Sequence, residues 1–193
     1  MDADFCAQFI KILHTQGTPG FHTLACYNKV ILFSCSEYEA RNHGRFLLGV
    51  LSDLHKWHSE EQTYIQDNRS RLGGKAVFHT GFQSQYRLPM PPENFLKWSA
   101  FQKIVRKWHK KISMVMTFFS YYSARLTGIQ AFIECIQTGE FMHVYNAIIV
   151  LKEILPYFPL SAVSQETGPQ LDKVMDQFLE KEERGDLKIL GRA

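Results

Sequence analysis

The distribution of glycine and proline constrains this chain more than any other feature of its sequence. Most of the 12 glycines and 7 prolines fall in three clusters, at 17–20, 73–92 and 156–169. Because both residues end or weaken helices, the long stretches between the clusters are helix candidates. Apolar residues in these stretches recur at steps of three and four, and no Asn-Gly or Asp-Gly dipeptide joins two alternating runs. The sequence therefore predicts an all-α fold.

Length and composition indicate one globular domain. A chain of 193 residues with 45% hydrophobic content can bury its own core, so we predict a single helical domain over residues 1–193. The formal net charge of +3 allows a nucleic-acid partner without indicating one. Four cysteines at irregular spacings and no signal-peptide pattern favour an intracellular protein with reduced thiols. Arg125 interrupts the most apolar stretch before the roughly 20 residues that a membrane helix needs, so no membrane association is expected.

The apolar pattern predicts the individual helices. The first has Phe5, Phe9, Ile12 and Leu13 on its inner side, and the third begins at a capping box formed by Ser36 and Glu39. The expected ranges are 2–14, 21–33, 36–58, 60–67, 129–137, 140–155 and 167–190. A further helix is expected to follow Pro92, with an apolar seam as far as Phe119 and an interruption at Gly128. Residues 68–92, which are polar and contain several glycines and prolines, are predicted to form the longest loop.

Inner and outer positions follow from the same pattern. The expected core residues of the third helix are Phe46, Leu47, Val50, Leu51, Leu54 and Trp57, and those of the helix before Pro156 are Val144, Ile148, Leu151 and Leu155. In the last helix, residues 180–183 are expected in solvent. Residues 54–58 and 105–109 form a near-repeat, which favours antiparallel helix pairs stacked as a HEAT-like α-solenoid fragment.

A basic face is predicted on the helix that follows Pro92. Its apolar seam runs from Trp98 to Phe119, and five cations within residues 103–111 project away from that seam. Such a face can bind a phosphate backbone or an acidic protein surface, and a merely solvated face is the alternative. Three cations of the 68–92 loop could extend it. The candidate binding residues are Lys103, Arg106, Lys107, Lys110, Lys111, Arg69, Arg71 and Lys75.

The sequence contains no motif that indicates a catalytic, metal or cofactor site. His55 and His58 could share one helix face, but zinc needs about four converging ligands, and no H-E-x-x-H motif or closely spaced cysteine pair is present. Lys75 follows two glycines without the rest of a phosphate-binding loop. We therefore expect no enzyme activity, no cofactor and no small-molecule substrate. A hydrolase that uses Cys or His stays open, and it predicts a deep polar pocket around one of those residues.

Several strings in a fixed order carry a family resemblance. The strings are CSEYEARNHGRF (35–46), KWH (56–58), KWHKK (107–111), TGEF (138–141) and NAIIVLKEILPYFP (146–159), with GTPGFHTL (17–24) before them and KEERGDL (181–187) after them. Together they resemble the C-terminal helical region of the THO complex subunit two family, the large scaffold subunits of the THO complex. The resemblance covers nearly the whole chain. Members of the family are much longer, and residues 114–127 look inserted relative to them.

The resemblance implies a nuclear, non-catalytic scaffold with a HEAT-like helical structure. Its implied role is to couple transcription and mRNA processing to mRNA export. The implied partners are other THO subunits, a DEAD-box RNA helicase and, through the basic face, mRNA. An independent helical-repeat RNA-binding module is the alternative function.

Residues of the densest matching string are expected to have structural roles. Glu37, Arg41 and Arg45 would cap or brace neighbouring helices. Gly44 within a helix costs about 1 kcal/mol relative to alanine, which indicates a close approach between helices.

Overall fold

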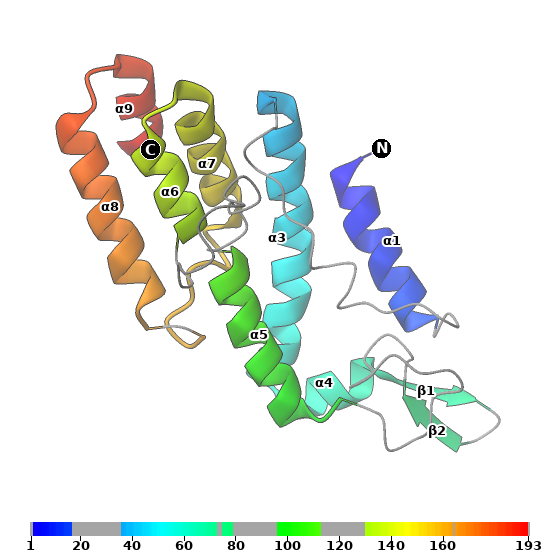
Figure 1. Ribbon diagram of the computed structural model, residues 1–193. Helices are drawn as coiled ribbons and strands as arrows, with labels where there is room; N and C mark the ends of the chain where they lie inside the picture. Colours follow the sequence, from blue (N-terminus) through cyan, green and yellow to red (C-terminus); the bar gives the residue numbers. More distant parts are fainter. Residues whose placement is uncertain are drawn as a thin grey trace, which may run out of the picture. The chain divides into compact units, whose positions relative to one another are not determined.

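The computed structural model describes residues 2–16, 36–72, 75–78, 96–112, 130–163 and 165–192. The chain divides into two compact units. Unit 1 comprises Met1–Lys29 and Gly49–Val105, and unit 2 comprises Val30–Leu48 and Arg106–Ala193. Helices α3 (Glu37–Ser59) and α5 (Trp98–Ile112) each contribute to both units (Figure 1). The prediction of one domain therefore stays a prediction.

Unit 1 is built on α1 (Ala3–Thr15), the second half of α3, α4 (Glu61–Asp67) and the first half of α5. Trp57 of α3 and Tyr64 of α4 are buried against Phe101 of α5, with ring centroids 6.4 and 4.8 Å from that of Phe101. The Tyr64 hydroxyl donates to the Leu96 carbonyl at 2.6 Å, and the Trp98 indole nitrogen donates to the Trp57 carbonyl at 3.0 Å. These bonds satisfy the polar tips of side chains whose rings form the core.

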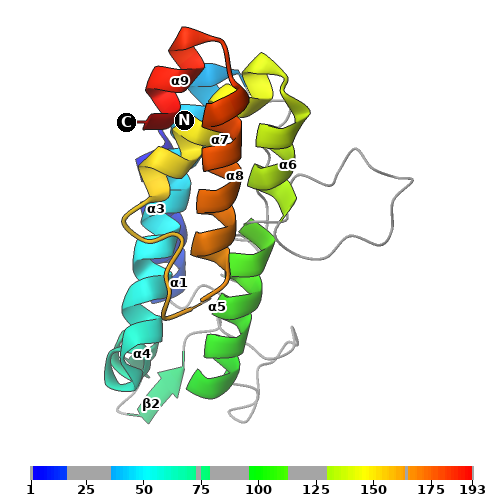
Figure 2. The same ribbon diagram turned by 90° about the vertical axis from the view of Figure 1, so that its left-hand side faces the viewer.

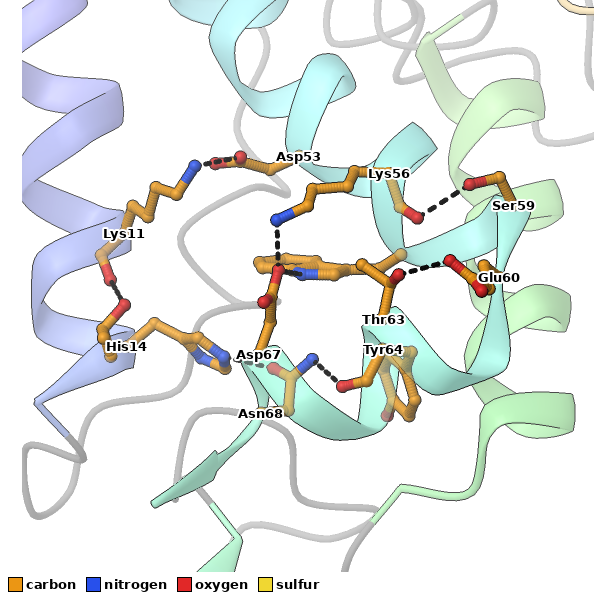
Figure 3. Close-up of polar contacts among 12 residues, drawn as sticks. Lys11, His14, Asp53, Lys56, Ser59, Glu60, Thr63, Tyr64, Asp67 and Asn68 are labelled. Carbon is orange, nitrogen blue, oxygen red and sulfur yellow. Dashed lines mark hydrogen bonds and ion pairs between the residues drawn. The ribbon is translucent and has the colours of Figure 1, made fainter. Parts of the chain in front are cut away.

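Helix α1 runs alongside α3 in three successive contacts. A Cβ atom added at Gly49 would lie 2.9 Å from the Cβ of Ala7, so the two backbones approach closely there. One turn further on, Lys11 forms an ion pair with Asp53 (Figure 3). One more turn along, the buried His14 ring lies 5.5 Å from the ring of Trp57.

The predicted inner face of α1 is wrong. Phe5, Phe9 and Ile12 are exposed, and Leu13 is half-buried, whereas Ala3, Ala7 and His14 are buried. Small residues allow α1 to approach α3 closely, and bulky side chains at the same positions would hold the two helices apart. Because α1 carries apolar residues on two opposite sides, its periodicity alone does not reveal which side is buried.

Part of the predicted 68–92 loop is a β-hairpin, which corrects that prediction. Strands β1 (Arg69–Leu72) and β2 (Lys75–Phe78) pair antiparallel, with Arg69 opposite Phe78 and Leu72 opposite Lys75. Two glycines, residues 73 and 74, separate the strands in the sequence, and Gly-Gly is a recognised two-residue hairpin signal. The absence of Asn-Gly and Asp-Gly dipeptides therefore does not exclude a hairpin at this position. With this exception, the all-α class is confirmed for the residues that the structure describes.

Unit 2 contains the first half of α3 with α6 (Gln130–Thr138), α7 (Phe141–Ile154), α8 (Thr167–Lys181) and α9 (Gly185–Arg192). Helices α6, α7, α8 and α9 lie side by side (Figures 1 and 2). Most of α7 is buried, from Val144 to Leu151 except Tyr145, which is half-buried. Val144, Ile148 and Leu187 form a buried cluster against which Tyr145, Met175, Phe178 and Leu190 pack.

The start of α3 and the break between α6 and α7 follow the sequence. The Glu39 amide donates to the Ser36 hydroxyl at 3.3 Å, and the Ser36 amide donates to the Glu39 carboxylate at 2.8 Å, which confirms the capping box. Gly139 has a φ of 68°, a left-handed conformation that glycine adopts without strain, and it separates α6 from α7 as expected.

The end of the chain differs from the prediction in three places. The single helix expected over 167–190 is two helices, because residues 182–184 are non-helical between α8 and α9. Glu182, expected in solvent, is only 8% exposed because it is paired with Arg184. Leu155, expected in the core, is 57% exposed and lies just past the end of α7.

Several predictions fall outside the described residues. These are the helix over 21–33, the continuation of α5 to Phe119, and the inserted segment 114–127. The solenoid arrangement also stays a prediction. Among the described residues, no helix has both the length and the apolar character to cross a membrane.

Candidate interaction surface

The first half of the predicted basic face is exposed on α5. Lys103, Arg106 and Lys107 are exposed, whereas Phe101 and Val105 on the other side of the helix are buried. None of the three cations forms an ion pair with a described residue, and the sequence of α5 contains no acidic residue. The positive charge of this helix is therefore not neutralised along its own length, as it would be on a face of mixed sign.

The remaining candidate cations lie in elements whose backbone is described. Lys110 and Lys111 belong to α5. Arg69, Arg71 and Lys75 belong to the β1–β2 hairpin, which follows α4 directly. These three residues were expected in a loop, and the structure places them in the two strands of a hairpin. The extension of the basic face to them stays a prediction.

His109 is a core residue of α5 that was not among the predicted inner positions. This histidine is 3% exposed, and its ring centroid lies 5.3 Å from that of Phe158. Phe101, Val105 and His109 follow each other at steps of four, which is the helical spacing that the apolar seam uses. A histidine between lysines in the sequence resembles an exposed, charged residue. Only its spacing of four residues from Val105 indicates that it is buried.

Two strings of the family resemblance, 35–46 and 146–159, meet in unit 2. A Cβ atom at Gly44 of α3 would lie 2.9 Å from the Cβ of Glu153 and 3.5 Å from the Cα of Val150, both on α7. The expected close approach at Gly44 is therefore confirmed. The small residue allows two helices from separate strings to pack with their backbones near each other.

An ion pair braces the start of α3 against α7, as expected for Glu37 and Arg41. The Arg41 guanidinium lies 2.9 Å from the Glu37 carboxylate, and the Tyr145 side chain of α7 hydrogen-bonds to this pair. The hydrogen bond from Arg41, followed by that from Tyr145, lowers the pKa of Glu37. Arg45, from the same string, is exposed. Both partners of the ion pair are about half exposed, so its contribution to stability is small.

Arg184 joins two of these strings at one point, and it was not among the predicted site residues. Its guanidinium nitrogens donate to the Glu182 carboxylate at 2.6 and 2.7 Å and to the Gly139 carbonyl at 3.0 Å. The guanidinium carbon also lies 6.0 Å from the centroid of the Phe141 ring. Hydrogen bonds from Arg184 lower the pKa of Glu182 to about 2, although burial opposes that shift. This cluster holds the α8–α9 connection against the α6–α7 connection.

A cavity of about 310 Å³ lies between α6 and α8, and neither cysteine nor histidine lines it. Its lining residues are Ile136, Gln137, Gly139, Val174, Gln177, Phe178, Lys181 and Glu182. Across the described parts of the chain, no three His, Cys, Asp or Glu side chains are grouped so that they could hold a metal ion. The surface with the clearest binding chemistry is thus the exposed cationic part of α5.

Comparisons with known proteins agree on one family. The family described as transcription factor/nuclear export subunit protein 2, or Tho2, matches residues 1–193. THO complex subunit 2 of Mus musculus and that of Homo sapiens are each 32% identical to this chain over 98% of its length. THO complex subunit 2 of Arabidopsis thaliana is 30% identical over the same share. No solved structure matches the chain.

The match covers almost all of this chain but only a small part of each relative. The chain spans only 11% of the length of the mammalian relatives and 9% of that of the plant relative. Within this chain the match is nearly complete, and it includes the strings that pack together through Gly44, Tyr145 and Arg184. By the full-length family match and by its identity to these relatives, the chain belongs to the Tho2 family of THO complex subunits.

Proposed function

We propose that the chain acts as a non-catalytic scaffold segment of a THO complex in the nucleus. In this role it would couple transcription and mRNA processing to mRNA export by binding other THO subunits and a DEAD-box RNA helicase. The observation that carries the proposal is the 32% identity over 98% of the chain to proteins named THO complex subunit 2. Helices braced by polar clusters such as Arg184 with Glu182 suit a protein that offers fixed surfaces to partners.

Affinity capture tests the scaffold proposal. The tagged chain is incubated with nuclear extract, and the bound proteins are identified by mass spectrometry after nuclease treatment, which removes partners bridged by RNA. Recovery of THO subunits, with or without the helicase, supports the proposal. Recovery of neither, from a chain whose circular dichroism shows a folded helical protein, contradicts it.

The exposed cations of α5 favour a second candidate function, direct binding of RNA. Lys103, Arg106 and Lys107 are exposed, form no ion pair with a described residue and lie along a helix without acidic residues. Cations placed in this way can neutralise the phosphates of RNA. Lys110 and Lys111 continue the same run in the sequence. RNA binding through this helix would hold either for a THO scaffold or for an independent helical-repeat module.

Charge reversal tests RNA binding with a matched control. The variant carries Lys103→Glu, Lys107→Glu, Lys110→Glu and Lys111→Glu, and the control carries Lys152→Glu, Lys173→Glu, Lys181→Glu and Lys188→Glu. Both variants change the net charge equally, so nonspecific attraction falls equally. If α5 is the binding surface, the first variant loses affinity for single-stranded RNA and shows a shallower dependence on salt, while the control retains most of its affinity. Equal losses in both variants would contradict a specific role for α5.

A further inference from the structure

Helix α1 contributes little large apolar surface to the core of unit 1. Its buried residues are Ala3, Ala7 and His14, and the two alanines each add only a methyl group. Its larger apolar side chains are half-buried or exposed, namely Phe5, Phe9, Ile10, Ile12 and Leu13. The buried aromatic rings that pack together in this unit belong to α3, α4 and α5. Because buried apolar area supplies most of the stabilisation of a fold, the core of unit 1 gains little from α1.

A hydrogen bond between two buried side chains holds the C-terminal end of α1. The His14 ring nitrogen Nε2 is bonded to the side-chain oxygen of Asn68, the residue that follows α4 (Figure 3). Asn68 is fully buried, and its amide nitrogen donates to the Tyr64 carbonyl at 2.7 Å, so its oxygen accepts from His14. Asn68 is thus fixed by α4 and offers one acceptor to α1. We call the pair of His14 and Asn68 the latch.

Two further contacts of α1, both with α3, are an ion pair and a contact between small residues. Lys11 pairs with Asp53, and the two side chains are 48% and 14% exposed. An ion pair that lies partly in solvent is weakened by water and by salt. Ala7 meets α3 at Gly49, where neither residue has a side chain larger than a methyl group. These contacts act over short distances, so a small outward shift of α1 breaks them together.

We propose that α1 is a detachable strap, which leaves α3 and α4 and returns while the rest of unit 1 stays folded. The closed state is the one in Figure 3, with the latch formed. In the open state, the Asn68 oxygen and the Asp53 carboxylate exchange their partners in α1 for water. Opening uncovers a strip of unit 1 made of Gly49, Asp53, Trp57 and Asn68, which α1 contacts in the closed state. The strap therefore controls access to this strip.

The open state is distinguishable from the closed state because α1 is short. It has 13 residues, and an isolated helix of this length is marginally stable in water. Once detached, α1 therefore loses most of its helical hydrogen bonds, and its backbone amides exchange with solvent. Amides of α3, α4 and α5 stay protected until unit 1 unfolds. Local opening of this kind costs less free energy than unfolding and exposes less surface.

Hydrogen exchange of the whole chain, followed by mass spectrometry at increasing low concentrations of urea, tests the strap. Peptides from α1 should exchange at least about tenfold faster than peptides from residues 50–57 of α3. The exchange rate of α1 should also depend weakly on urea, because opening exposes little surface, whereas that of α3 should rise steeply. Equal rates and equal urea dependence in both helices would show that α1 opens only by unfolding, and they would overturn the proposal.

His14→Ala removes the latch and tests its role. Alanine favours helix more than histidine does, so faster exchange of α1 in this variant reports on docking rather than on helix propensity. The exchange of α1 is expected to accelerate about tenfold, because Asn68 loses its donor. Gln8→Ala, at an exposed position of the same helix, is the matched control and should not accelerate exchange. Equal rates in the two variants would overturn the assignment of the latch.

Phe101→Leu separates opening of the strap from unfolding of unit 1. The substitution weakens the aromatic core against Trp57 and Tyr64, so it should accelerate exchange in α3 and α4 several-fold. It should leave the rate of α1 within about twofold of the wild-type rate, because the closed and open states share this core. Circular dichroism checks that each variant is as helical as the wild type. Acceleration of α1 by the same factor as α3 would overturn the proposal.

Discussion

Gly44 illustrates how a single missing side chain determines packing in this protein. Its Cα faces the backbone of α7, and an added Cβ would lie 2.9 Å from the Cβ and 3.0 Å from the Cγ of Glu153. Such contacts are too short for carbon atoms, and a Cβ atom close to its own backbone cannot move aside as the end of a long side chain can. The residue therefore fits this position because it has no side chain, despite its poor helix propensity.

Gly44→Ala is expected to destabilise the chain. Overpacking of this kind costs about 1–3 kcal/mol, which outweighs the gain of about 1 kcal/mol in helix propensity. We expect a net loss of about 1 kcal/mol in the free energy of unfolding, measured by urea denaturation. Gly185→Ala is the control, because a Cβ there would meet nothing within 4 Å. Equal effects of the two substitutions would contradict the packing explanation.

His43 links stability to pH. Burial lowers the pKa of His43 to about 4, from an ordinary value of about 6.5, and its ring stacks on Phe46. Below pH 6.5 the unfolded chain binds a proton that the folded chain does not bind until about pH 4. The stabilising effect of the neutral ring is therefore complete above pH 6.5 and is lost as the pH falls towards 4.

The size of this effect can be measured with His43→Gln. The shift corresponds to a loss of up to about 3 kcal/mol between pH 6.5 and 4 in the wild-type chain. The glutamine variant cannot bind this proton, so its stability should fall less over that interval. The difference between the two curves isolates His43 from the other titrating groups. Parallel curves would show that the ring is not kept neutral by burial.

At the scale of elements, the non-helical residues between helices decide how the helices pack in unit 2. Residues 182–184 interrupt what the apolar pattern presents as one helix, and they allow α9 to turn back so that Leu187 joins Val144 and Ile148. Arg184 stabilises this turn because it bonds both to Glu182 and to the Gly139 carbonyl between α6 and α7. Two connections far apart in sequence are thus held by one side chain.

Arg184→Leu should be strongly destabilising. It leaves the Glu182 carboxylate, which is 8% exposed, without its charged partner and leaves the Gly139 carbonyl without this donor. Removing one partner leaves the other charge unpaired, and the partial exposure of Arg184 makes the expected loss smaller than that for a fully buried pair. Thermal unfolding followed by circular dichroism measures it. The double variant Glu182→Gln with Arg184→Leu should recover part of the loss, because no buried charge then remains unpaired.

The capping box at the start of α3 can be tested on its own. Ser36→Ala removes the acceptor of the Glu39 amide and the hydroxyl that donates to the Glu39 carboxylate. The expected loss is about 1 kcal/mol of unfolding free energy, measured in urea. Ser99→Ala, an exposed serine in the first turn of α5, is the control and should change stability little. If Ser36→Ala left the free energy of unfolding unchanged, packing against α7 rather than the capping box would determine where α3 begins.

At the scale of the whole molecule, two helices are shared between the two compact units. Helix α3 passes from unit 2 into unit 1 at residues 48 and 49, and α5 passes from unit 1 into unit 2 at residues 105 and 106. Helix formation is cooperative along a continuous segment, so unfolding of one unit would fray helices that the other needs. The predicted single domain therefore implies one cooperative unfolding transition.

Two probes on one variant test this cooperativity. Trp108→Phe leaves Trp57 and Trp98, both in unit 1, as the only tryptophans, whereas circular dichroism reports on helices of both units. A further Ile148→Ala substitution in the core of unit 2 should destabilise the chain by about 2–4 kcal/mol. If the chain unfolds as one domain, the fluorescence and dichroism midpoints shift together. A fluorescence midpoint that does not move would show that unit 1 unfolds independently.

The class of fold and most helix boundaries follow from local sequence patterns. Breakers, caps and apolar spacing act within a few residues, so the capping box at Ser36, the break at Gly139 and the buried seam from Leu47 to Trp57 could be predicted locally. Gly44 was also identifiable, because a glycine inside a helix has a local cost that only a tertiary contact explains. The same ordered strings that predicted helices also indicated the family.

Which face of each helix is buried depends on its neighbours in three dimensions. The inner side of α1 is Ala3, Ala7 and His14 rather than Phe5, Phe9 and Ile12, because the neighbouring α3 accepts small residues at close range. Arg184, Glu182 and His109 take their places through partners 2 to 49 residues away in the sequence. The spacing of apolar residues along a helix indicates which side chains share a face. It does not indicate which neighbouring element will cover that face.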